Sequence, residues 1–136
     1  MPGLDTNLVV RWLLDDDAAQ SARVAELFAA SAARNEPLFV PTTVLLELEW
    51  VLRSRYGFDR PAIVRAMNAL LETEELLFEN ESLLEQVLDF FKHAPADFAD
   101  CLHAGACVVA GHLPMLTFDR NATKVPGVEL LGPSSH

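Results

Sequence analysis

The stretch PLFVPTTVLLELEWVLRSRYG, residues 37–57, decides the fold class. Pro37 and Pro41 bracket a three-residue apolar run that is typical of a short β-strand. Two threonines then begin a helical pattern, and Gly57 ends it, because glycine readily adopts the left-handed conformation that follows many helices. A strand that leads directly into a helix indicates an α/β protein.

The alternation of strand and helix continues on both sides of this stretch. Upstream, the acidic run 15–17 is predicted to cap a helix over residues 18–33, and downstream Asp59 caps one over 62–71. Two further helices are predicted over residues 83–94 and 97–111, and short strands over 76–79, 115–118 and 128–131. Short strands separated by helices pair in parallel. We therefore predict one domain over residues 1–136, a three-layer α/β/α sandwich with a short-stranded, mainly parallel central sheet.

Composition limits the classes of function. The 136 residues carry a net charge of −10, so long-range attraction does not bring a nucleic acid to this protein, and any such partner is bound locally. A hydrophobic content of 51% excludes a disordered acidic tail and predicts that part of the apolar surface contacts a partner. The sequence has neither a secretory leader pattern nor a long apolar run, so we expect a cytoplasmic protein without a membrane segment.

Two acidic residues follow predicted strands. Asp5 comes directly after a very short apolar start, and Asp119 comes directly after the run MLTF of residues 115–118. Functional groups of parallel sheets collect where the strands end, which makes both residues candidates for a site. The alternative is that each carboxylate only caps a turn through nearby backbone.

The central helix carries two glutamates that its periodicity separates. With Val44 as the reference direction and about 100° per residue, Glu47 falls at the border of the apolar stripe and Glu49 on the far side. We therefore expect Glu47 to point partly inward and Glu49 to face water. A carboxylate beside an apolar stripe needs a cation or hydrogen bonds, and a buried ion pair with an arginine is the alternative to a functional role for Glu47.

A third acidic pair lies near the start of the helix predicted over residues 97–111. Asp97 and Asp100 are three residues apart and so share a helix face, close to the positive end of the helix dipole. Asp100 is the better candidate for a site, and Asp97 is either a second ligand or the helix cap. Four or five carboxylates gathered together require a divalent cation, and oxygen ligands favour Mg²⁺ or Mn²⁺ over zinc.

Four segments, taken in order, resemble the PIN-domain family, and within it the VapC-type toxins of bacterial toxin–antitoxin pairs. The segments are GLDTN (3–7), LLELEWVLR (45–53), ADFADCLHA (96–104) and MLTFDRNATKVPGVELL (115–131), so the resemblance spans nearly the whole chain. It implies an acidic metal-binding and catalytic site formed by Asp5, Glu47, Asp100 and Asp119, with accessory residues Asp97, Thr6, Asn7 and Thr117. For the threonines and the asparagine, turn formation and strand-end hydrogen bonding are an equal alternative.

This sequence departs from the family pattern at two places. Asn121 and Ala122 stand where the family often has an acid and an aromatic residue, which removes an extra ligand and a packing contact. Pro2 replaces the usual apolar residue at the start of the first strand and cannot donate a ladder hydrogen bond, so we expect that strand to be short or irregular.

The resemblance implies a Mg²⁺- or Mn²⁺-dependent endoribonuclease that forms a homodimer and is neutralised by a cognate VapB-type antitoxin. Arg53 and Arg120 are candidates for contacts with RNA phosphates, and the alternative is that they are ordinary solvated charges. Another class of function stays open, a catalytically silent antitoxin-binding or co-repressor module whose acids serve recognition only. Such a surface has no need of four carboxylates forced together, which favours the enzyme.

Overall fold

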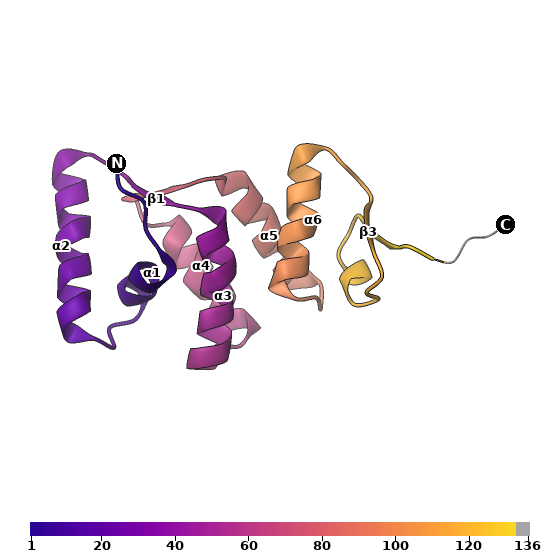
Figure 1. Ribbon diagram of the computed structural model, residues 1–136, viewed down its shortest axis with the longest axis horizontal. Helices are drawn as coiled ribbons and strands as arrows, with labels where there is room; N and C mark the ends of the chain where they lie inside the picture. The colour runs from indigo at the N-terminus through magenta and orange to yellow at the C-terminus, as the bar shows by residue number, and fades with distance from the viewer. Residues whose placement is uncertain (133–136) are drawn as a thin grey trace. The chain divides into compact units, whose positions relative to one another are not determined.

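A computed structural model describes residues 1–132 of the chain, as two compact units. The first unit, Met1–Glu81, holds α1 (Thr6–Leu13), α2 (Ala18–Arg34), β1 (Leu38–Val40), α3 (Thr42–Tyr56), α4 (Arg60–Leu71) and β2 (Leu76–Phe78). The second begins at Ser82 and holds α5 (Glu81–His93), α6 (Phe98–Ala110), β3 (Met115–Thr117), a 3₁₀ turn η1 (Ala122–Lys124) and β4 (Val128–Leu130). Figure 1 follows these elements along the chain. A single domain over residues 1–136 stays a prediction, and its last four positions lie outside the described residues.

The strands of each unit pair in parallel, as predicted. In the first unit β1 pairs with β2, with Leu38 opposite Leu76, and two helices lie between these strands in the sequence. In the second unit β3 pairs with β4, with Met115 opposite Val128, and only η1 intervenes. The described strands thus form two sheets of two, and the predicted α/β class with short parallel strands is confirmed.

The helix ends confirm the capping residues predicted from the sequence. The Asp17 carboxylate accepts a hydrogen bond from the Gln20 amide at 3.1 Å, and Asp59 caps α4 in the same way. Gly57 ends α3 with a φ of 68°, in the left-handed region that glycine adopts without steric cost. These helix ends therefore lie where local chemistry satisfies free backbone groups.

The chain before α1 forms an irregular edge rather than a strand. Only Gly3 forms a parallel bridge, with Phe39 of β1, and the Pro2 carbonyl accepts from the Phe39 amide at 2.9 Å. The short first strand expected from Pro2 is confirmed, and Asp5 begins α1 directly after this edge.

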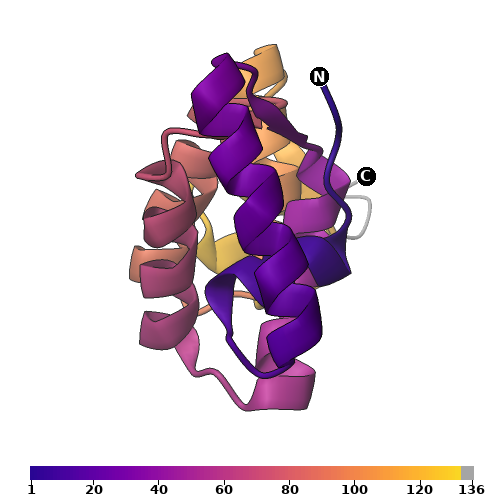
Figure 2. The same ribbon diagram turned by 90° about the vertical axis from the view of Figure 1, so that its left-hand side faces the viewer.

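Helix α1 anchors the core of the first unit. It packs against α2 and α3, which lie beside it in Figures 1 and 2, and it buries Val9 and Val10. The Trp12 ring of α1 stacks on Phe28 of α2, with ring centroids 3.7 Å apart and planes only 4° from parallel. The position of α1 matters because it carries the first candidate site residues at its N-terminal end.

The second unit packs α5 closely around small residues of α6. Cys101 and Ala104 are buried, and Gly105 lies so close to α5 that an added Cβ would stand 3.0 Å from Val87. Neither cysteine forms a disulfide within the described residues, and Cys107 is half-buried because it lies further round the helix from that contact. None of the helices in the described part of the chain is long and apolar enough to cross a membrane.

Candidate active site

The first unit carries the acidic residues Asp5 and Glu47, which we call the first acidic group. Asp5 is the N-cap of α1, and its Oδ1 accepts a hydrogen bond from the Leu8 amide at 3.0 Å. A carboxylate in this position favours helix formation, so the capping alternative is correct for one oxygen of Asp5. The residue is exposed, and one oxygen suffices for the cap, so the other is free to bind a cation.

Glu47 is held by a residue from the start of α1. The hydroxyl of Thr6, which is buried, donates a hydrogen bond to Oε1 of Glu47 on α3. The bond joins residues 41 positions apart in the chain. It fixes the direction of the Glu47 carboxylate and places it beside the residue that follows Asp5. Thr6 therefore acts as a positioning residue for the first acidic group.

The predicted burial of the two glutamates on α3 is wrong. Glu49 is only 5% exposed, whereas Glu47 lies on the exposed side of the helix. The prediction took Val44 as the centre of the buried face, but Val44 is half-buried. The buried face is centred instead on Leu45 and Leu52, about 90° further round the helix. That rotation carries Glu49 to the edge of the core and Glu47 away from it.

The ion pair with an arginine that was considered for Glu47 belongs to Glu49, and it is only partly buried. Its Oε2 accepts from Nε of Arg53 at 2.9 Å, one helical turn later. The i, i+4 spacing of an acid and an arginine on α3 is a signal for this pair that the sequence already contained. Arg53, whose side chain is 56% exposed, thus has its charge partly compensated. Its contact with RNA stays a prediction.

The second unit carries Asp97, Asp100 and Asp119, which we call the second acidic group. Asp97 occupies the N-cap position of α6 but its side chain makes no capping hydrogen bond. Asp100 lies in the first turn of the same helix and is half-buried. The two alternatives for Asp97 therefore resolve in part: the residue stands at the cap, and its carboxylate is not engaged there.

The charges of the second acidic group act on one another. Burial raises the pKa of the Asp100 carboxyl, and the negative charges of Asp119 and Asp97 raise it further, while His103 acts in the opposite direction. Such a shift means that three acids lie close enough to oppose their joint ionisation. A cation bound among them would relieve this repulsion.

Asp119 is set in place by a turn after β3. Its amide donates to the Thr117 hydroxyl at 3.0 Å, and its Oδ1 accepts from the Asn121 amide at 2.9 Å. Thr117 thus has the strand-end hydrogen bond considered for it, and Asn121 contributes backbone rather than a side chain. The Asp119 carboxylate is exposed, and Arg120 beside it is exposed as well.

The acidic side chains of the two groups have the chemistry of a metal site but do not form a complete one among the described residues. Over residues 1–132, no three His, Cys, Asp or Glu side chains lie in an arrangement that would hold one. The donors themselves are carboxylate oxygens, which suit Mg²⁺ or Mn²⁺, and the raised pKa of Asp100 marks a place where negative charge lacks compensation. The chemistry therefore fits such an ion, and a shared ion between Asp5, Glu47, Asp100 and Asp119 stays a prediction.

Comparisons with known proteins find similarity over nearly the whole chain. The family model of the PIN domain matches residues 4–128. A VapC ribonuclease of Aquifex aeolicus (strain VF5) is 23% identical over 130 residues, which is 96% of this chain and 95% of that protein. The matched region contains all four principal acids and every accessory residue named above.

Proposed function

The chain belongs to the PIN-domain family, and from this premise we propose that it is a Mg²⁺- or Mn²⁺-dependent endoribonuclease toxin of the VapC type. Membership of the family also carries the predicted three-layer α/β/α fold. One observation supports the chemistry above all: the pKa of Asp100 is raised by burial and by two neighbouring carboxylates. Acids held in this state are typical of sites that bind a hard cation.

The reaction is hydrolysis of an RNA phosphodiester bond. Asp5, Glu47, Asp100 and Asp119 would hold the ion, which supplies a more acidic water and charge stabilisation at the phosphate. Thr6 directs the carboxylate of Glu47, and the turn at Thr117 sets the position of Asp119. Asp97 is the accessory acid, since its carboxylate makes no cap bond. Asn7 follows Thr6 in α1 and is exposed, where it would contact the substrate.

Surface arginines assist an otherwise acidic protein in binding RNA. Arg120 is exposed directly after Asp119, and its side chain makes no ion pair within the described residues. Arg53 is exposed on α3, about 1.7 helical turns beyond Glu47. Contacts of this kind align the backbone and do not read the base sequence.

The remaining proposals concern partners and location. We expect a homodimer in the cytoplasm and neutralisation by a VapB-type antitoxin that places an arginine against the acids. A guanidinium supplies positive charge and paired hydrogen bonds to carboxylates, so it would compete with the ion.

The proposed activity is tested by RNA cleavage with Mn²⁺, with Mg²⁺ and with excess chelator. We expect cleavage with either ion and none with chelator. Asp100→Asn is expected to lower the cleavage rate by about a hundredfold or more, because a ligand is lost. Glu85→Gln on α5 removes the same charge from an exposed position in the same unit and serves as the control. Cleavage that persists in chelator, or in Asp100→Asn, would contradict the proposal.

A further inference from the structure

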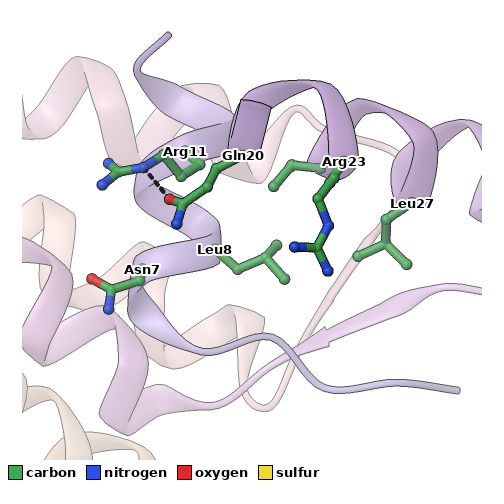
Figure 3. Close-up of a pocket in the computed structure, with 7 residues that line it drawn as sticks. Asn7, Leu8, Arg11, Gln20, Arg23 and Leu27 are labelled. Atoms are coloured by element: carbon green, nitrogen blue, oxygen red, sulfur yellow. Dashed lines mark hydrogen bonds between the residues drawn. The ribbon is translucent and has the colours of Figure 1, made fainter. Parts of the chain in front are cut away.

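A pocket of about 370 Å³ lies between α1 and α2, entirely within the first unit. Leu8, Val24 and Leu27 provide its apolar lining. Arg11 and Arg23 contribute guanidinium groups, and Figure 3 shows Arg23 extending from α2 toward Leu8 of α1. The volume is in the range of small-molecule sites, at the lower end. It is large enough for a nucleotide.

The charge of this pocket is opposite to that of the protein. Its lining contains two arginines and no acid, in a chain with a net charge of −10. Arg11 is held from both sides, by Gln20 Oε1 at 2.7 Å and Asp16 Oδ1 at 3.0 Å. Arg23 is exposed and has no ion pair within residues 1–132. The pocket therefore presents one uncompensated cation beside an apolar surface, which suits an anion with an apolar part.

The pocket begins next to the first acidic group. Its lining includes Asn7. Asn7 directly follows Thr6, and the hydroxyl of Thr6 donates a hydrogen bond to Glu47. Since α1 rises about 1.5 Å per residue, Arg11 lies about 9 Å along the helix from Asp5. A strand of RNA with one phosphate at Asp5 would reach the pocket with an adjoining nucleotide.

We propose that this pocket binds a nucleotide of the RNA substrate next to the scissile phosphate, an inference that rests on the proposed function. A backbone phosphate pairs with Arg23, and the base lies over Leu8 and Leu27. The side-chain amide of Asn7 and the Nε2 amino group of Gln20, whose Oε1 is bonded to Arg11, face the polar edge of the base. Unstacked bases of single-stranded RNA are bound in this manner, by apolar contact and hydrogen bonds to their edges.

The test measures binding of a short labelled single-stranded RNA to the full chain carrying Asp100→Asn, which keeps the RNA intact. In this background Arg23→Glu is expected to weaken binding about tenfold and to reduce the salt dependence of log K by about 0.7. Arg23→Lys keeps the charge and is expected to restore the salt dependence. Arg65→Glu, an exposed arginine on α4 outside the pocket, makes the same charge change and is expected to bind within twofold of the parent.

The outcomes separate the pocket from the proposed activity. If the unaltered chain cleaves RNA and Arg23→Glu binds like the parent, the nucleotide pocket is refuted and the nuclease stands; an acidic peptide would then be the better occupant. Equal losses in Arg23→Glu and Arg65→Glu refute it as well, because they indicate general charge repulsion. If the unaltered chain neither binds nor cleaves RNA, the proposed function fails, and this inference with it.

Discussion

Replacing Thr6 with valine tests whether the hydrogen bond between α1 and α3 sets up the site. Valine has nearly the same shape but cannot donate to Glu47, and the Thr6 side chain is buried, so little else changes. A hydrogen bond to a charged acceptor contributes about 1.5–3 kcal/mol when buried; Glu47 is exposed and regains water, which reduces the loss to about 1 kcal/mol. For a chain of this size that lowers the Tm by about 3–5 °C.

The functional effect of Thr6→Val is expected to exceed the effect on stability. Residues that orient a metal ligand typically change ion affinity or activity about 10–100-fold. The assay is RNA cleavage as a function of Mn²⁺ concentration, well below the Tm, so that unfolding does not contribute. We expect the half-saturating Mn²⁺ concentration to rise by about tenfold or more.

Two variants control this experiment. Thr6→Ser keeps the hydroxyl and is expected to retain most of the Mn²⁺ affinity. Thr43→Val makes the same chemical change at an exposed position of α3 and is expected to alter neither quantity. A Thr6→Val protein with parental Mn²⁺ dependence and parental cleavage would refute the positioning role, whatever its Tm.

Three further predictions concern stability. Asp100→Asn is expected to raise the Tm in chelator at neutral pH. The pKa of Asp100 is raised in the native state, so the native state binds this proton more tightly than the unfolded state, and the stability of the parent falls as the pH rises above the ordinary carboxyl pKa of 3.8. Below pH 3.8 the variant should melt at the same temperature as the parent. Gly105→Ala places a methyl group 3.0 Å from the buried Val87, so the free energy of unfolding in urea should fall by about 1–2 kcal/mol, although alanine has the better helix propensity. A more stable variant would contradict the close packing of α5 and α6. Glu49→Gln weakens the bond to Arg53 and should lose about 1–2 kcal/mol in the same measurement, and an unchanged midpoint would show that the pair contributes nothing.

Local chemistry accounts for the parts of the fold that the sequence predicted well. Asp17 and Asp59 bond to amides three residues later, and Gly57 adopts a positive φ, so each helix end depends on its immediate neighbours. The parallel pairing of β1 with β2 followed from the helices between these short strands, whereas β3 and β4 pair in parallel with only a 3₁₀ turn between them. The helix-end interactions lie within a window of about ten residues, so local sequence is enough to predict them.

The errors arise where distant segments decide. On α3 the periodicity alone did not locate the core, because the helix is apolar over more than one face and α1 determines which side is covered. The assignment of Glu47 and Glu49 was reversed for this reason. The bond from Thr6 to Glu47 spans 41 positions and has no local signal. The assignment of the site acids rests on the family motifs and stays a prediction.

The stack of Trp12 on Phe28 provides an intrinsic fluorescence probe. The indole belongs to α1 and its partner ring to α2, the same two helices that line the pocket with Arg23. Only one other tryptophan is present, Trp50, so Trp50→Phe would leave a single emitter whose quantum yield and anisotropy respond to any shift between these helices. Binding of ligands to the pocket between α1 and α2 can therefore be followed by tryptophan fluorescence without a label.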